Sequence, residues 1–414
     1  MKAQNRRNLL NNIKFLSVCR PLALLLSLLF ILSCQDEKSK TPKTAAAPSH
    51  ETVSQNQLTR FGDAGLTKLA DKLLAGGQSV HILQLGDSHT AADLFTGQLR
   101  QRFQQRFGDG GPGVISPLMV PGQRSAVVGF TKPGRDWQLY STRKGPREDF
   151  PFTGLIAQPL QDNADVTLTL KNPSGGRYQV SALYKSSADA MLALDRGSVQ
   201  TLPDSQNHWQ LSSARQATFP LNATLGGGNH LQLGGWFITS GNPGVIFSAV
   251  GINGATLSAW DKWQADWLMP FAALKPDMVI LEYGTNEAFN DDLDPVLYRR
   301  QLEKRIAQIR ETLPDAAILL IGPPDSIKNK EQTTCSAREP VSLAKVMNIQ
   351  KQVAEAQQLL FWDWRAFMGG ACSMERWSAT GYARPDLVHL STDGYKKSAN
   401  ALFDQLISLL EKAQ

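Results

Sequence analysis

The sequence predicts an α/β fold, in which a parallel sheet is covered by helices on both faces and is interrupted by an inserted all-β module. Two observations support this fold class. Short apolar runs alternate with amphipathic segments in residues 58–117 and again in residues 248–414, which is typical of a parallel sheet. Between them, residues 118–247 are rich in glycine and proline and show short alternating runs but no long helical pattern. This middle segment therefore indicates a β-sandwich.

The individual elements follow from local patterns in chain order. The first α/β part begins with a helical pattern that ends in glycine, "LTKLADKLLAGG". An apolar strand, "VHILQL", and a second helical pattern, "AADLFTGQLRQRF", follow it. The clearest strands of the middle segment are "DVTLTLKN", "RYQVSALYKS" and "HLQLGGWF". In the second α/β part, strands at "DMVILEYG", "AAILLIGPP" and "LLFWDW" alternate with three helical patterns, "PVLYRRQLEKRIAQIRETL", "VSLAKVMNIQKQVAEAQQL" and "GYKKSANALFDQLISLLEK".

The first 33 residues have the pattern of an export signal. They carry five bases and no acid, and the bases precede the uncharged apolar run Pro21–Ser33. This run is shorter than the roughly 20 residues that a transmembrane helix needs. We therefore expect residues 1–33 to be a signal peptide, and the alternative is an N-terminal anchor that stays attached.

The charge of the remaining chain argues against a nucleic-acid partner. The whole sequence has 43 Lys and Arg against 37 Asp and Glu. Without the five bases of the leader, 38 bases face 37 acids, so the folded part is close to neutral. A nucleic-acid-binding surface usually gives a clear excess of bases, and none is expected here.

The leader ends in "ILSC", which resembles a bacterial lipobox. The resemblance implies that Cys34 is lipidated and becomes the new N-terminus. Because Gln35 rather than aspartate follows, it also implies a periplasmic lipoprotein of the outer membrane, which meets the membrane only through its lipid. Residues 34–57 contain almost no large apolar side chain and are expected to form a flexible tether.

The other cysteines can be assigned by compartment. Cys19 lies in the leader, which leaves Cys335 and Cys372 as a pair. In an oxidising compartment we expect these two to form a disulfide. The sequence contains no CxxC or HExxH motif, and we expect no metal site.

Polar residues that could take part in catalysis follow the predicted strands. "GDSH" comes directly after "VHILQL", which places Ser88 at the carboxyl edge of the sheet and at a helix N-terminus. Taken alone, Ser88 fits an ordinary helix cap as well as a nucleophile. Asn286, in "GTNE", follows another strand, and its side-chain amide can donate to an oxyanion. Gly254, in "GINGA", lets the backbone N–H approach the same oxygen.

The stretch "DLVH" supplies the partners that a serine nucleophile needs. Asp386 and His389 are three residues apart before the last helix, and in a helical turn such residues face the same way. An acid there can orient the imidazole, so that its other nitrogen acts as a base for Ser88. Asp87 is expected to cap the helix that follows it. His89 is a rival base, but side chains of adjacent residues diverge, which disfavours it.

Together these motifs resemble the SGNH, or GDSL, hydrolase superfamily. "GDSH" followed by a β insertion is similar to the form found in periplasmic peptidoglycan O-acetylesterases, although the superfamily's leucine after the serine is His89 here. The resemblance implies a three-layer, flavodoxin-like fold and a carbohydrate-binding type of sandwich. It also implies a catalytic set, which comprises Ser88, Asp386 and His389. It implies an oxyanion hole as well, which is formed by Ser88, Gly254 and Asn286.

The resemblance further implies the reaction. The expected enzyme needs no cofactor and removes acetyl groups from muramyl residues of O-acetylated peptidoglycan. Trp209 and Trp236 of the inserted module are candidates for stacking on sugars. The alternatives are acetyl transfer to another sugar, deacetylation of another periplasmic polysaccharide, and a wall-binding lipoprotein without activity. The sequence does not predict the oligomeric state.

Overall fold

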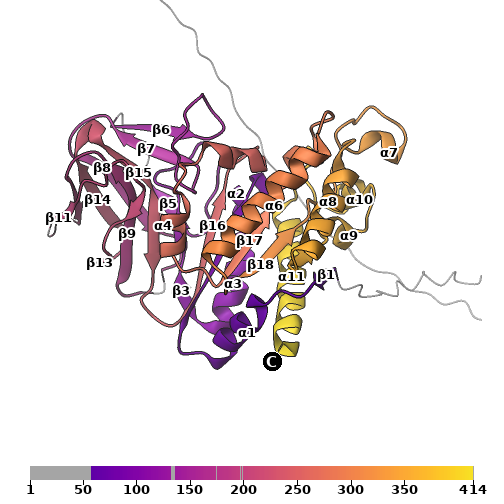
Figure 1. Ribbon diagram of the computed structural model, residues 1–414, viewed down its shortest axis with the longest axis horizontal. Coiled ribbons are helices and arrows are strands. Elements are labelled where there is room, and N and C mark those ends of the chain that lie inside the picture. Colours follow the sequence, from indigo (N-terminus) through magenta and orange to yellow (C-terminus); the bar gives the residue numbers. More distant parts are fainter. Residues whose placement is uncertain (1–56, 132–135, 174, 196, 198, 414) are drawn as a thin grey trace, which may run out of the picture. The chain divides into compact units, whose positions relative to one another are not determined.

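The computed structural model describes residues 57–131, 136–173, 175–195, 197 and 199–413 (Figure 1). The predicted signal peptide, Cys34 and the predicted tether up to residue 56 lie outside the described residues. Among the described helices, none combines the length and the apolar character that crossing a membrane requires.

A seven-stranded sheet forms the centre of the α/β part, with the strand order β1-β19-β18-β17-β2-β16-β3. Neighbouring strands are parallel except for the pair β1 and β19. The strands are β1 (Leu58–Arg60), β2 (Ser79–Gly86), β3 (Asp109–Gly111), β16 (Gly244–Gly251), β17 (Met278–Glu282), β18 (Ala317–Ile321) and β19 (Leu360–Trp362). The predicted α/β class with a parallel sheet is confirmed, and the antiparallel edge strand β1 is an addition to it.

Helices cover both faces of this sheet. On one face lie α1 (Gly65–Ala75), α3 (Phe95–Phe107) and α11 (Thr392–Lys412), and on the other lie α4 (Leu268–Ala273), α6 (Pro295–Thr312) and α8 (Leu343–Ala356). Along β2, Val80 and Ile82 belong to the core of the first face, and Leu83 and Leu85 belong to the core of the second. Successive strand residues point to opposite faces, so a strand buried on both sides is apolar throughout. In Figure 1, α11 (yellow) runs beside α3.

Shorter helices connect these elements. They are α2 (Ser88–Ala91), η2 (Leu257–Lys262), α5 (Thr285–Ala288), α7 (Cys335–Arg338), α9 (Trp364–Met368) and α10 (Ser373–Ala379). The disulfide between Cys335 and Cys372, with 5.8 Å between their Cα atoms, joins α7 to the start of α10. Glu339 lies beside this pair, but sulfurs bonded to each other are not free thiolate ligands for a metal.

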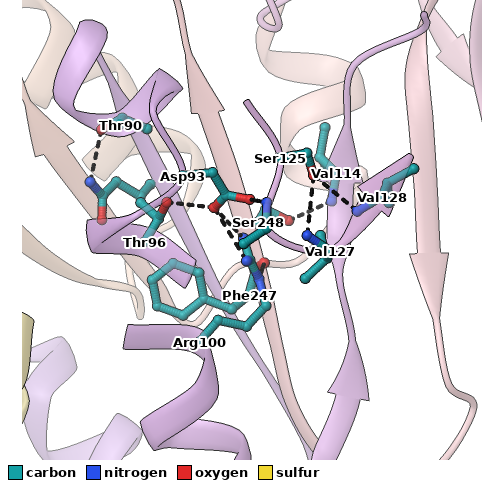
Figure 2. Close-up of polar contacts among 12 residues, drawn as sticks. Thr90, Asp93, Thr96, Arg100, Val114, Ser125, Val127, Val128, Phe247 and Ser248 are labelled. Carbon is teal, nitrogen blue, oxygen red and sulfur yellow. Dashed lines mark hydrogen bonds and ion pairs between the residues drawn. The ribbon is translucent and has the colours of Figure 1, made fainter. Parts of the chain in front are cut away.

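The predicted helix "AADLFTGQLRQRF" is broken in the structure. Asp93 lies between α2 and α3 with φ of 47°, a left-handed conformation that costs a non-glycine residue about 1–2 kcal/mol. Its buried carboxylate accepts hydrogen bonds from Thr96 and Arg100 (Figure 2). These bonds stabilise the break, which a helical pattern alone does not reveal.

The inserted module consists of two antiparallel sheets, as predicted. One has the order β11-β10-β14-β8-β5, and the other follows β12-β9-β15-β7-β6, with β4 and β13 paired to its inner strands. Leu168, Val180, Leu225 and Trp236 are among the residues of the core that both sheets share. The elements are β4 (Gly113–Ile115), β5 (Val128–Phe130), β6 (Trp137–Ser141), β7 (Leu155–Pro159), β8 (Ala164–Leu170), β9 (Tyr178–Ser186), β10 (Ala190–Leu194), β11 (Val199–Leu202), β12 (Gln210–Leu211), β13 (Arg215–Ala217), β14 (Leu221–Gly226), η1 (Gly228–His230) and β15 (Leu231–Thr239).

The strand pairing differs from the predicted module boundaries of 118 and 247. β4, which begins at residue 113, pairs with β15 of the module. At the other end, β16 pairs with β2 along its whole length and so belongs to the parallel sheet. An apolar run can be recognised as a strand from its sequence, but the run does not say which of two sheets it joins.

The second face of the module packs against the α/β part. Phe152 of the module contacts Phe271 of α4, with 5.6 Å between the ring centroids, and Trp209 belongs to the same core. Only 2% of Trp209 and none of Trp236 is exposed. The suggestion that these two tryptophans stack on sugars is therefore wrong, because their rings fill the core instead.

Candidate active site

Three neighbouring strands bring the predicted site together. β2, β16 and β17 are adjacent and parallel, so their carboxyl ends meet at one edge of the sheet. Ser88 follows β2, Gly254 follows β16 and Asn286 follows β17, each within four residues of the strand end. All three residues line one cleft of about 610 Å³, and His389 lines it too. Ligands of open α/β sheets bind at this edge.

Ser88 is the first residue of α2 and is partly exposed, whereas its neighbours Asp87 and His89 are fully buried. As predicted, Asp87 caps this helix, and its carboxyl oxygen accepts a hydrogen bond of 2.9 Å from the His89 N–H. The Ser88 hydroxyl lies 3.0 Å from Nε2 of His389. With the proton on Nδ1, this arrangement lets the hydroxyl donate to the imidazole.

Asp386 holds the other side of the imidazole, with 3.1 Å between its Oδ2 and Nδ1 of His389. The expected helical turn is absent, because residues 384–390 form a tight turn in which Leu387 has φ of 61°. The other oxygen of Asp386 accepts bonds from the N–H groups of Val388 and His389, at 3.0 and 2.8 Å. An acid and a histidine three residues apart therefore meet without a helix.

The charge of Asp386 is stabilised in this turn. Partial burial opposes its ionisation, but the two backbone N–H groups and the imidazole outweigh that effect and lower the pKa of Asp386. The carboxylate is thus charged at neutral pH and can stabilise an imidazolium on His389.

The two predicted oxyanion donors are held by α5. Gly254 has φ of 71°, a left-handed conformation that suits glycine. Nδ2 of Asn286 donates to the carbonyl of Ala255 at 2.9 Å. The next residue, Glu287, accepts a bond of 2.7 Å from the Leu257 N–H. Two adjacent side chains of α5 therefore hold the chain just after Gly254, and before it the N–H of Ile252 donates to the carbonyl of Gly86.

His89 is part of the support below the cleft. Its side chain is fully buried, and its Nδ1 lies 2.8 Å from the hydroxyl of Tyr395. Burial, together with the neighbouring His389, lowers the pKa of His89 to about 3. The Ser88 hydroxyl contacts His389. The ring of His89 contacts Tyr395 instead.

Three buried carboxyl groups lie below the cleft, and sequence reasoning missed this cluster. Burial raises the pKa of Asp87 to about 8, an effect that the bond from His89 reduces and Glu287 increases. Burial also raises the pKa of Glu287, to about 7, and burial together with Asp87 raises that of Glu282. Glu287 belongs to the motif "GTNE", but this short sequence does not reveal that its carboxyl group is buried.

Asp87 contacts the candidate oxyanion donor directly, because Nδ2 of Asn286 also lies 3.2 Å from its Oδ2. Both amide protons of Asn286 thus have an acceptor in the free protein. A neutral carboxyl is a weaker acceptor than a carboxylate and does not repel an oxyanion. The protonated form of Asp87 therefore leaves one amide proton more available to a reacting substrate.

We expect kcat to fall when the pH rises above about 8, because Asp87 then ionises. The sign follows from its acid chemistry: below that pH the carboxyl is neutral, and above it the charge holds the Asn286 amide and repels the oxyanion. In Asp87→Asn, which cannot ionise, the decline should disappear, although one contact with Asn286 is lost and the maximal rate is lower. The measurement is kcat on an aryl acetate between about pH 6 and pH 10. The control is Asp294→Asn, at the N-cap of the distant α6, which should keep the fall of kcat at high pH. If Asp87→Asn also kept this fall, another group would be responsible for it.

The fold and the cleft define a class of enzyme, the SGNH-type esterases. Residues 229–397 match the model of the GDSL-like lipase/acylhydrolase family. Residues 110–222, which cover most of the inserted module, match the model described as the N-terminal part of peptidoglycan O-acetylesterase. A solved structure entitled "Peptidoglycan O-acetylesterase in action, 5 min" is 36% identical, with a TM-score of 0.79, over 86% of this chain and 99% of that one. The chain belongs to the peptidoglycan O-acetylesterase family.

Other solved structures are far less similar. A putative GDSL-like lipase from Parabacteroides merdae is 17% identical, with a TM-score of 0.32, over 39% of this chain and 72% of that one. An acetyl xylan esterase has 17% identity and a TM-score of 0.31, over 39% of this chain and 79% of that one. These likenesses are too weak to support a conclusion on substrate. No curated protein matches the chain.

Proposed function

We propose that this protein removes O-acetyl groups from muramyl residues of peptidoglycan through an acetyl-enzyme intermediate on Ser88. The observation that supports this proposal most directly is the continuous chain from the Ser88 hydroxyl through His389 to Asp386, at 3.0 and 3.1 Å. This chain opens onto the cleft that Gly254 and Asn286 also line. The substrate follows from membership of the family.

In the first half of the reaction, Ser88 Oγ attacks the acetyl carbonyl carbon while its proton passes to Nε2 of His389. The carbonyl oxygen becomes an oxyanion, which the N–H groups of Ser88 and Gly254 and the amide of Asn286 stabilise. When the tetrahedral intermediate collapses, the sugar oxygen leaves and takes the proton from His389. The acetyl group stays on Ser88.

In the second half, His389 takes a proton from water, and the resulting hydroxide attacks the acetyl-enzyme. Acetate leaves, and Ser88 Oγ regains its proton from His389. Ser88 is partly exposed, and the side chain of His389 is 31% exposed. This access for water favours hydrolysis over transfer of the acetyl group to another sugar. The intact chain of Ser88, His389 and Asp386 argues against a binding protein without activity.

The direct experiment measures acetate released from O-acetylated peptidoglycan by the purified protein, with chemically deacetylated peptidoglycan as the matched control. Acetate should appear only with the acetylated polymer. Hydrolysis of an aryl acetate without release from peptidoglycan would show an esterase with a different natural substrate.

We also propose that the protein acts in the periplasm as an outer-membrane lipoprotein anchored through Cys34. The support is the leader and lipobox pattern of the sequence together with a family whose substrate lies outside the cytoplasm. Cys34→Ala should shift the protein from the membrane fraction to the soluble periplasmic fraction, and the wild-type protein should incorporate a labelled fatty acid. Membrane association that does not depend on Cys34 would contradict the lipid anchor.

A further inference from the structure

The cleft that contains Ser88 is cationic. The described residues that line it include two arginines, Arg124 and Arg384, and neither aspartate nor glutamate. A third arginine, Arg143, stands next to Gly254, since a Cβ built on that glycine would lie 3.2 Å from the guanidinium. The chain after its leader is nearly neutral, so this local excess of positive charge does not follow from the overall composition, and it favours an anionic ligand.

Arg124 is available to such a ligand. Its side chain is exposed, and within the described ranges no carboxylate lies at ion-pairing distance from it. Arg384, in contrast, lies 3.8 Å from Asp386 and so stands next to the candidate catalytic residues. An arginine presents a planar fork of donors that matches a carboxylate and binds it with two hydrogen bonds.

The backbone around Arg124 is held in place by the α/β part. Its own N–H points to the carbonyl of Ala91, at 3.4 Å. The next residue, Ser125, accepts bonds from the N–H groups of Val127 and Val128 (Figure 2). The N–H of Ala126 donates to Asp93, at 2.5 Å. Arg124 therefore reaches the cleft from a fixed base, close to the end of the helix that begins with Ser88.

A second cavity continues from the cleft past Arg124. It has a volume of about 490 Å³ and shares Ala92, Leu94 and Arg124 with the cleft. Apart from Asp93, which pairs with Arg100, its remaining walls come from the module, including Gly129 of the edge strand β5, and a further cation, Lys171, lies in its lining. The two cavities therefore adjoin each other at these three shared residues.

We propose that Arg124 binds a carboxylate of the acetylated glycan and that the glycan extends past Arg124 into the second cavity. This inference rests on the proposed function and makes the substrate class more specific: a polymeric saccharide whose muramyl carboxylates near the acetyl ester are free and are not joined to a peptide through an amide. Arg124 is then a specificity-determining residue, because it contacts the substrate away from the reacting atoms.

The test compares three acetyl esters with the wild-type protein and with Arg124→Gln. They are an aryl acetate, an O-acetylated muramic acid saccharide with a free carboxylate, and the same saccharide with that carboxylate converted to a neutral amide. The wild type should prefer the carboxylate over the amide by about tenfold in kcat/KM, mostly through KM, as expected for a charged hydrogen bond. Higher salt should reduce this preference.

In Arg124→Gln, kcat/KM for the carboxylate substrate should fall about tenfold more than for the amide or the aryl acetate. Arg124→Lys, which keeps the charge but loses the fork, should recover part of the loss. The matched control is Arg300→Gln, an exposed arginine of α6 outside both cavities, which should behave like the wild type. An equal loss on all three esters, or no loss on any, would overturn the inference.

The extension of the glycan is tested by Gly129→Trp. A Cβ at position 129 would meet only Thr169 O, at 3.9 Å, and Gly129 lines the second cavity, so the large side chain is chosen to obstruct it. Turnover of a long O-acetylated glycan should fall more than turnover of the short saccharide, and equal effects would overturn this part. If the wild type hydrolysed the acetyl esters of the carboxylate and the amide saccharides equally well, the role of Arg124 would be disproved but the proposed esterase function would stand. If it hydrolysed only the aryl acetate, both would be disproved.

Discussion

Ser88→Ala is expected to abolish acetate release while leaving the fold intact, and His389→Ala is expected to do the same. In the proposed mechanism Ser88 forms the covalent bond, and His389 takes and returns its proton across a contact of 3.0 Å. Nucleophile and base act as one unit, so losing either costs about as much as losing both, which in the serine protease subtilisin is roughly 10⁶-fold in kcat. The double variant should therefore be no less active than either single variant.

The measurement is release of acetate from peptidoglycan and hydrolysis of an aryl acetate, with circular dichroism and a thermal melt to show that each variant is folded. Ser213→Ala, an exposed serine of the module that does not line the cleft, is the matched control and should keep full activity. Substantial turnover by folded Ser88→Ala would exclude the covalent mechanism. Two single variants whose losses multiply in the double variant would mean that Ser88 and His389 act independently.

Asn286→Ala is expected to lower kcat by about 10²–10³-fold with little change in KM, which is the usual effect of removing one oxyanion donor. The amide stabilises charge that develops only during the reaction, so the ground-state complex loses little. Asn286 also binds the Ala255 carbonyl, and a looser Gly254 loop would add to the loss in kcat.

Steady-state kinetics on a small ester give kcat and KM separately. The matched control is Asn290→Ala, an exposed amide at the end of the same segment that does not line the cleft; this variant should be close to wild type. If the effect of Asn286→Ala appeared in KM alone, Asn286 would bind the substrate in its ground state and would not act on the oxyanion.

Much of the candidate site could be predicted because parallel strands end at one edge of a sheet. Ser88, Gly254 and Asn286 each follow an apolar run, and the structure places those runs side by side as β2, β16 and β17. The residue spacing was less informative for Asp386 and His389. Three-residue spacing suggests a helix, but the short side chain of an aspartate can also fold the backbone into a turn by accepting its N–H groups.

The features that could not be predicted depend on contacts between distant parts of the chain. β16 looks the same as a strand of the module until its pairing with β2 is known. Trp209 looks like a surface ring for sugars until the packing of the module against α4 is known. The buried acids Asp87 and Glu282 go against the rule that carboxyl groups stay in water, and such exceptions are found only from the fold.

The shared core between the module and the α/β part limits how this enzyme can be divided. Phe150, Phe152 and Trp209 of the module bury their side chains with Trp260 and Phe271 of the α/β part. A shortened chain that kept only the sheet and its catalytic loops would lack the three module rings and would expose Trp260 and Phe271 to water, at a cost of about 1.5–3 kcal/mol for each large apolar side chain. Although the module is encoded as an insertion, it shares a core with the α/β part, so we expect its removal to destabilise the part that carries the esterase site.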